Sequence, residues 1–199
     1  MNTYEIFAVV FSLICVLLTI KENIWQWLFG IVGVLFYFIV FYRAKLYANM
    51  WLQVMFVILQ LYGWYTWLYG GKDDNALLIS RSPATINLLL VLLAVTGIAA
   101  LTYYFKTQTD NPMPLADASA TALSLIAQWM LAEKYLENWL VWIAVNLIII
   151  IIGVARKLYL TAGLYILFFV LAILGFIEWL KAMPKLSVSF IIWFLEGLK

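Results

Sequence analysis

The sequence predicts an all-α membrane protein with seven transmembrane helices, arranged as two three-helix repeats around a linker helix. Composition predicts the class: 67% of the 199 residues are hydrophobic, 11% are charged, and the mean hydropathy is +1.02. A soluble domain of this size cannot bury so much apolar surface. An internal repeat predicts the arrangement of the helices.

Seven apolar segments, separated by short polar links, give the predicted helices. They cover residues 4–20, 24–42, 46–69, 83–105, 118–132, 139–155 and 158–177. Pro83 suits the first turn of the fourth helix, and Asp117 is expected to cap the fifth. Transmembrane strands are not expected, because open sheets cannot sit in lipid and alternating ten-residue segments are missing.

The third segment, residues 46–71, has no charge but carries a stripe of amides and aromatic rings. The stripe repeats at steps of three and four and therefore lies on one helix face: Asn49, Gln53, Phe56, Gln60, Trp64 and Trp67. Amides in hydrocarbon are costly unless they find partners or line a cavity. We predict that this face binds a ligand. The alternatives are interhelical hydrogen bonds for the glutamines, an interfacial cap for Asn49 and an interfacial belt for the tryptophans.

A first set of repeated residues has an offset of 112. The Lys-Leu-Tyr triplet at 45–47 recurs at 157–159, and the same offset pairs Gly63 with Gly175. These matches do not involve only the apolar residues that recur by chance in a membrane protein, so they indicate a duplication. The paired glycines are expected to allow close helix approach.

A second match has an offset of 115. The Glu-Asn pair at 22–23, followed by Trp27, recurs at 137–138, followed by Trp142. The change of offset predicts a three-residue insertion within the second or sixth helix. Both Glu-Asn pairs are expected to cap the helices that follow them.

The repeat divides the chain into four parts. Residues 1–71 form the first repeat, 72–116 the linker helix with its flanking loops, 117–181 the second repeat and 182–199 a tail. An odd linker helix gives both halves the same orientation, which is a parallel repeat like that of the SWEET sugar transporters. By analogy, substrate binds at mid-membrane between the repeats, and the halves rock to give alternating access. The tail after Pro184 is predicted to lie at the interface or on a neighbouring subunit.

The second half supplies further candidate binding residues. Tyr165 and Trp179 occupy stripe positions equivalent to those of the third helix, and they are predicted to form a flat wall. Asn146 and Trp142 share a face of the sixth helix, and Gln128 on the fifth helix is predicted to reach the same cavity.

Charge and residue usage exclude several kinds of chemistry. There is no histidine, the single cysteine is Cys15, and the net charge is only +2. We therefore expect no catalytic residues, no metal site, no cofactor and no nucleic-acid partner. The predicted spans lack Lys and Arg away from their ends, which disfavours phosphorylated ligands.

With these residues in view, the chain resembles the PnuC family of nicotinamide riboside transporters over nearly its whole length. The matching motifs are Lys45-Leu46-Tyr47-Ala48 with Leu52-Gln53, Tyr62-Gly63-Trp64, Trp67, Asp117-Ala118, Ala127-Gln128-Trp129, Leu131-Ala132, Lys134, Glu137-Asn138-Trp139, Trp142, Gly163-Leu164-Tyr165, Gly175 and Trp179. The departures are Asn146, where the family more often has a carboxylate, and the unusual tail.

The resemblance implies facilitated uptake of nicotinamide riboside, an NAD precursor and form of vitamin B3, across a bacterial inner membrane. It also implies a homotrimer in the lipid bilayer and a cytoplasmic kinase that phosphorylates the imported riboside. Thiamine and riboflavin are the alternative substrates, because relatives carry them. A non-transport membrane subunit remains a more remote alternative. Three other classes fit the sequence poorly. A receptor bundle would not contain the internal repeat. An intramembrane enzyme would need a nucleophile with a base, and an ion channel would need a selectivity filter, and neither is found in the sequence.

Overall fold

The computed structural model of the chain describes residues 3–183 except 44, 46 and 72–76. The described part forms the helices α1 (Thr3–Ile20), α2 (Gln26–Arg43), α3 (Tyr47–Tyr69), α4 (Ala84–Gln108), α5 (Pro114–Ala132), α6 (Asn138–Ala155) and α7 (Tyr159–Ala182). Each predicted helix is present. The prediction for the tail after Pro184 falls outside the described residues.

Two helices differ from the prediction by four or more residues at one end. α5 begins at Pro114 instead of residue 118, because proline fits the first helical position, where its missing N–H costs no hydrogen bond. Asp117 therefore does not cap α5; it lies in the first turn and pairs with Arg156. α7 runs to Ala182 instead of residue 177, since the charged residues of its last turn lie exposed on the helix surface.

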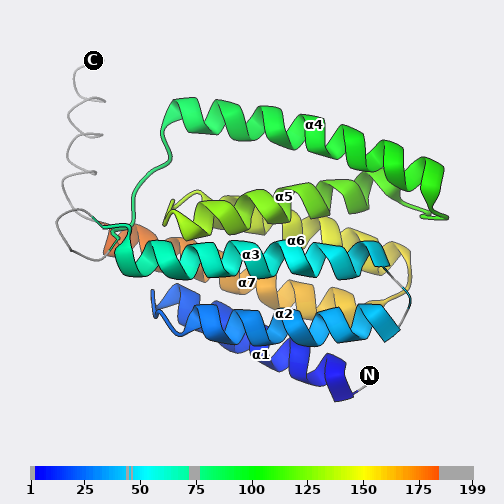
Figure 1. Ribbon diagram of the computed structural model, residues 1–199, viewed down its shortest axis with the longest axis horizontal. Helices are drawn as coiled ribbons and strands as arrows, with labels where there is room; N and C mark the ends of the chain where they lie inside the picture. Colours follow the sequence, from blue (N-terminus) through cyan, green and yellow to red (C-terminus); the bar gives the residue numbers. More distant parts are fainter. Residues whose placement is uncertain (1–2, 44, 46, 72–76, 184–199) are drawn as a thin grey trace.

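The helices lie side by side and their connections gather at two ends (Figure 1). The N-terminus and the α2–α3, α4–α5 and α6–α7 connections lie at one end, called here the N-terminal end. The α1–α2 and α5–α6 connections lie at the other end, called here the tryptophan end because the buried core there contains Trp27, Trp67, Trp139 and Trp179.

The bundle consists of two three-helix units, α1–α2–α3 and α5–α6–α7. Sequence neighbours pack together within each unit, and the units meet where α3 contacts α5 and α1 contacts α7. α4 packs against α5 on the outside of the bundle (Figure 1). The surface between the units is therefore built from helices of both halves of the sequence.

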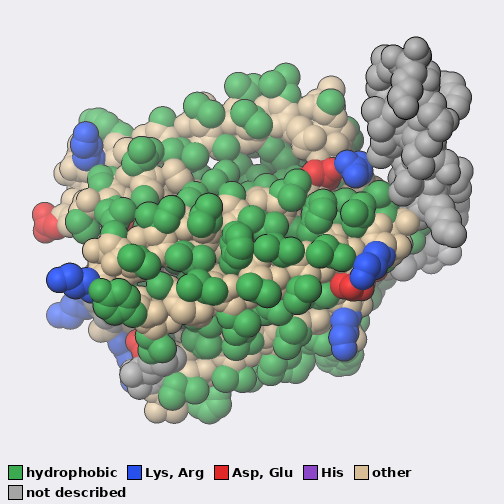
Figure 2. Space-filling model, turned by 180° about the vertical axis from the view of Figure 1, so that it is seen from behind, with side chains coloured by type: hydrophobic (Ala, Val, Ile, Leu, Met, Phe, Trp, Pro, Cys, Tyr) green, Lys and Arg blue, Asp and Glu red, His purple; other side chains and the backbone are tan. Residues whose placement is uncertain are grey.

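Six of the described helices are long and apolar enough to cross a membrane. α3 is not among them, although it has 23 residues and no charge. Its amides and aromatic rings lower its hydropathy. Hydrophobic side chains cover the middle of the face seen in Figure 2, and charged side chains lie towards its two ends. This is the surface of a multi-pass membrane protein.

The two units have the same turn at positions 112 residues apart. Glu22 and Lys134 lie in the α1–α2 and α5–α6 turns with φ values of 51° and 52°. In each turn the backbone N–H of this residue donates to the carbonyl three residues earlier. Lys45 and Lys157, in the α2–α3 and α6–α7 turns, both have a φ of 58°.

The offset of 112 also holds for the contacts of two tryptophans with two glycines. A Cβ added at Gly63 would lie 2.1 Å from Cη2 of Trp27, and one at Gly175 would lie 2.5 Å from Cη2 of Trp139. The sequence predicted a close approach of helices at these glycines, whereas the atoms that come closest to them belong to a tryptophan ring of the preceding helix. Trp27 thus corresponds to Trp139, so its predicted match with Trp142 is wrong, as is the three-residue insertion.

The units are joined by a reciprocal pair of hydrogen bonds at the tryptophan end. Trp67 donates its Nε1–H to the carbonyl oxygen of Leu131 at 3.2 Å, and Trp179 donates its Nε1–H to that of Thr19 at 3.0 Å. Donors and acceptors are both 112 residues apart. Each unit therefore gives the other the same contact.

Candidate functional site

A cavity of about 420 Å³ lies between the two units. Its size is in the range of roughly 300–1,000 Å³ found for small-molecule sites. Seven of the nine predicted binding residues line it: Asn49, Gln53, Gln60, Gln128, Trp142, Asn146 and Tyr165. The structure thus brings together residues from α3, α5, α6 and α7. Their role in binding stays a prediction.

The three amides of the α3 stripe, Asn49, Gln53 and Gln60, line the cavity. Gln60 is only 6% exposed, and its Oε1 has no hydrogen-bond partner among the described residues. Gly30 on α2 makes room for this amide, because a Cβ there would lie 2.1 Å from that oxygen. Gln53 donates from Nε2 to the carbonyl oxygen of Asn49 at 3.4 Å. The stripe therefore places polar atoms deep between the units.

The second unit contributes two further buried amides. Gln128 on α5 is 8% exposed and Asn146 on α6 is 4% exposed, and both line the cavity. Neither side chain makes a hydrogen bond to another described residue. A buried amide without partners costs free energy. These two side chains are consequently available to bind a polar ligand.

Aromatic rings form the other part of the cavity wall. Trp142, Tyr165 and Phe168 line it from the second unit, and Tyr37 and Phe56 line it from the first. The rings of Tyr165 and Phe168 pack edge to face, with their centroids 5.7 Å apart. Such faces can hold a flat ring, and they attract a cation.

Two predicted binding residues, Trp64 and Trp179, do not line the cavity. Trp64 packs against the buried core of the tryptophan end. Trp179 is fully buried in that core and gives its indole N–H to Thr19. The stripe position alone did not reveal this, because α3 and α7 leave the cavity wall before they reach their last turns.

Two amides that the sequence analysis did not propose as binding residues lie in the cavity wall. Gln26 and Asn138 are 112 residues apart and almost fully buried. Gln26 accepts a hydrogen bond at Oε1 from Thr19, and Asn138 donates one from Nδ2 to the carbonyl oxygen of Tyr135. Nε2 of Gln26 and Oδ1 of Asn138 have no hydrogen-bond partner in the part of the chain that the structure describes. Holding the offset of 112 through the second helix would have revealed this pair.

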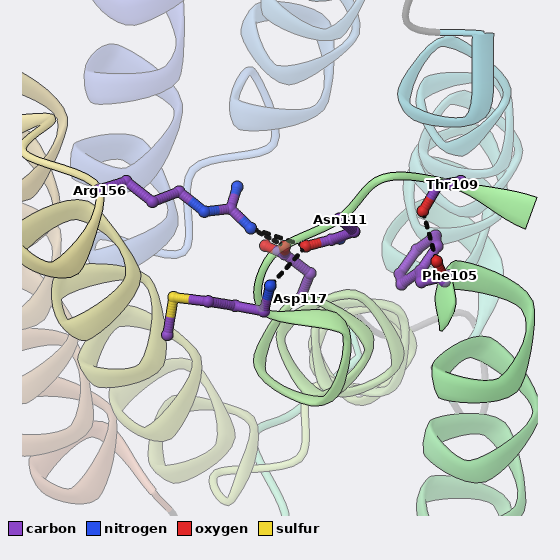
Figure 3. Close-up of polar contacts among 6 residues, drawn as sticks. Phe105, Thr109, Asn111, Asp117 and Arg156 are labelled. Carbon is purple, nitrogen blue, oxygen red and sulfur yellow. Dashed lines mark hydrogen bonds and ion pairs between the residues drawn. The ribbon is translucent and has the colours of Figure 1, made fainter. Parts of the chain in front are cut away.

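Asp117 is the only charged residue among the described residues that line the cavity. Its carboxylate pairs with Arg156, which also donates to Oδ1 of Asn111 at 2.8 Å (Figure 3). Arg156 itself is not part of the wall, so none of the described residues in the wall has a cationic side chain. In the described part of the chain, no three His, Cys, Asp or Glu side chains are grouped to hold a metal ion.

The cavity is closed at the tryptophan end. The rings of Trp27 and Trp67 lie 5.3 Å apart, those of Trp67 and Trp179 lie 6.2 Å apart, and those of Trp179 and Trp139 lie 5.5 Å apart. Towards the N-terminal end the cavity reaches Asn49, which is exposed. The structure therefore gives access to the cavity from the N-terminal end.

The α5–α6 turn concentrates charge at the tryptophan end. Burial, followed by the carboxylates of Glu133 and Glu137, raises the pKa of Tyr135 above its ordinary value. The phenol therefore stays neutral at physiological pH. Lys134, between these residues, is the cation of the turn and is buried to 6% exposure.

The sequence model of the nicotinamide mononucleotide transporter family matches residues 2–181 of the chain. The chain belongs to this family. The nicotinamide riboside transporter PnuC of Escherichia coli (strain K12) is 26% identical over 203 residues, covering 89% of this chain and 85% of the relative. The riboflavin/roseoflavin transporter RibM of Streptomyces davaonensis is 23% identical, covering 85% of this chain and 81% of the relative.

A solved structure has the same fold. The crystal structure of the vitamin B3 transporter PnuC matches with a TM-score of 0.71 at 24% identity, covering 90% of this chain and 81% of that one. The resemblance noted in the sequence is thereby confirmed at the level of family and fold. Proteins of the nicotinamide mononucleotide transporter family are transporters and not enzymes. The chain is a multi-pass protein of a bacterial inner membrane.

Proposed function

We propose that the protein carries nicotinamide riboside across the membrane by facilitated uptake. The observation that carries this proposal is the cavity between the units, which combines unpaired buried amides with aromatic faces. Relatives named nicotinamide riboside transporter point to the same substrate. No cofactor takes part in the proposed transport.

The chemistry of the riboside matches the two kinds of wall. Its pyridinium ring is flat and positively charged, and a cation over an aromatic face gains about 0.5–2 kcal/mol. Trp142 and Tyr165 offer such faces. The ribose hydroxyls and the carboxamide need hydrogen-bond partners, and Gln60, Gln128 and Asn146 offer them. Asn49 and Gln53 would meet the substrate nearer the N-terminal end.

The charges of the wall favour the riboside over its phosphorylated form. A phosphate in a low dielectric needs Arg or Lys partners, and the wall has neither among its described residues. Its one ionised side chain, Asp117, is an anion. We therefore expect the nucleotide to be rejected, although the family is named after it.

Riboflavin is the second candidate substrate, because the relative RibM is named as a riboflavin/roseoflavin transporter. Thiamine, which has a flat and positively charged thiazolium ring, is the third candidate substrate. Riboflavin is neutral and has three fused rings, so it would gain less from the aromatic faces and would need more of the cavity. Both are therefore ranked below the riboside.

We further propose that the fold is a SWEET-like parallel repeat of seven spans, in which α3 spans the membrane despite its amides. The identical turns and the reciprocal tryptophan bonds, all at an offset of 112, support the repeat. Such halves relate by an axis along the membrane normal and rock about the bound substrate to give alternating access. Residues 1–71 and 117–181 would be the two halves, residues 72–116 the linker and residues 182–199 an additional tail. A homotrimer and a cytoplasmic kinase acting on the imported riboside complete the proposal.

Titration of the purified protein with nicotinamide riboside, thiamine and riboflavin, followed by uptake into proteoliposomes, tests the proposed function. We expect the tightest binding and the fastest uptake for the riboside. Tighter binding of thiamine or riboflavin would overturn the substrate and keep the family. Uptake of none of the three would overturn the transport proposal.

A further inference from the structure

An ion pair at the tryptophan end joins two residues that occupy equivalent places in the two units. Nζ of Lys134 lies 2.9 Å from Oε2 of Glu22. The two residues are 112 apart, and they have matching positive φ values of 52° and 51°. Their side chains are 8% and 31% exposed. Equivalent residues of two repeats meet only where the units approach each other about their common axis.

The charges of this pair are complementary although the positions are equivalent. A duplication with the same ionised residue at both places would bring two like charges together, which is destabilising. Here one unit presents an acid and the other a base. Nζ of Lys134 also lies 4.4 Å from the ring centroid of Trp67, so the ion pair rests directly on the tryptophan layer that closes the cavity.

The turn that carries Lys134 is also held from other sides. Ser80, in the linker before α4, donates its N–H to the carbonyl oxygen of Lys134 at 3.1 Å and accepts from the N–H of Leu136 at 2.9 Å. Tyr62 on α3 donates its hydroxyl hydrogen to Glu133. These contacts join the α5–α6 turn to α3 and to the linker, and the ion pair with Glu22 is its contact with the α1–α2 turn.

We propose that Glu22 and Lys134 form a charged latch that keeps the tryptophan end closed. This proposal rests on the proposed transport function, since a transporter must open this end once in each cycle. Rocking of one unit against the other moves the two turns apart, which separates the ion pair and the cross-unit tryptophan contacts together. The latch therefore sets the balance between the two open states; it does not contact the substrate.

Cys15, the chain's single cysteine, lines the cavity and reports its accessibility without engineering. A membrane-impermeant, charged methanethiosulfonate reagent is applied to right-side-out and to inverted vesicles. The rate of Cys15 modification then measures how often each end is open, with the Cys15→Ser protein as the blank. Wild-type protein should react faster from the face that carries the N-terminal end.

Three latch variants and one control are compared. Glu22→Gln and Lys134→Gln each remove one charge, and the double variant Glu22→Lys/Lys134→Glu exchanges the charges between the units. By the offset of 112, the exchanged lysine would lie over Trp179, the counterpart of Trp67. The control is Lys181→Gln, which breaks an exposed pair with Glu178 within one helix at the same end. Thermal melting checks that each variant folds.

We expect each single variant to raise Cys15 modification from the tryptophan-end face by about tenfold, within the usual range of conformational coupling. The exchanged pair should return it to within about twofold of wild type, and the control should leave it unchanged. In uptake, the single variants should change kcat more than KM, because the latch does not touch substrate.

Equal modification of wild-type protein from both faces would overturn the latch, as would single variants that react like wild type. The latch would also be overturned if the double variant Glu22→Lys/Lys134→Glu showed the same Cys15 modification as the single variants. That result would mean that Lys134 acts through packing and not through its charge. Modification needs no substrate. Failure of wild-type uptake would therefore overturn the proposed function separately from the latch.

Discussion

Removal of the amide of Asn146 is expected to weaken riboside binding without weakening the fold. The side chain is 4% exposed, lines the cavity and makes no hydrogen bond to another described residue. Asn146→Ala therefore leaves no protein donor or acceptor without its partner. The change in affinity then reports the bonds made to the ligand.

The size of the effect follows from one or two neutral hydrogen bonds. Each is worth about 0.5–1.5 kcal/mol, so the Kd should rise by about 2- to 13-fold for one bond and by more for two. Ser124→Ala is the matched control. Ser124 also lines the cavity, but its hydroxyl is already bonded to the carbonyl oxygen of Ala120 at 2.7 Å, so the Kd should change less than twofold.

Isothermal titration calorimetry on the purified proteins measures both variants with nicotinamide riboside, and thermal melting checks that both fold. The reasoning is refuted by an Asn146→Ala protein that binds the riboside within twofold of wild type. It is equally refuted by a Ser124→Ala protein that loses as much affinity as Asn146→Ala. Gln60→Ala is expected to weaken binding in the same way.

Three further predictions concern packing, charge and selectivity. Gly63→Ala and Gly175→Ala place a Cβ 2.1 Å and 2.5 Å from a tryptophan ring and should destabilise the protein by about 1–3 kcal/mol. Gly163→Ala, with nothing within 4 Å, should not lower the melting temperature. Asp117→Ala and Arg156→Ala should each lower the melting temperature. A double-mutant cycle of the two should give a coupling free energy of about 0.5–3 kcal/mol. Additive effects on stability would contradict the ion pair. Nicotinamide mononucleotide should bind at least about tenfold more weakly than the riboside in calorimetry, because the described residues of the wall include no cation for its phosphate. Equal affinity would contradict this.

Much of the fold followed from local physical chemistry. The apolar segments predicted all seven helices, because a helix in lipid must satisfy its own backbone groups and needs about 20 apolar residues. The helical period predicted that Asn49, Gln53 and Gln60 share a face, and that face does point at the cavity. α5 begins four residues before the predicted start, because Pro114 fits the first helical position.

The repeat illustrates where sequence matching failed. A shared Glu-Asn pair suggested an offset of 115 within the second helix, whereas the contacts of Trp27 with Gly63 and of Trp139 with Gly175 give 112 throughout. Gln26 and Asn138 were missed as cavity residues for the same reason. Matching identical residues can pair positions that do not correspond in the two units. A tryptophan ring packed on a glycine identifies the corresponding positions directly, because close packing admits few other partners.

The sequence by itself determined the class of protein, the helices and which side chains share a helix face, because these depend on composition and on a 3.6-residue period. Only the tertiary structure decided which helix faces pack against each other and which of them line the cavity. Trp179 shares the periodicity of Tyr165, yet it is buried in the closed end and bonded to Thr19, while Tyr165 lines the cavity. Glu22 and Lys134 looked like ordinary turn residues until the two units brought them within 2.9 Å. The physical reason is that both assignments depend on contacts between the repeats, which the period of a single helix does not contain.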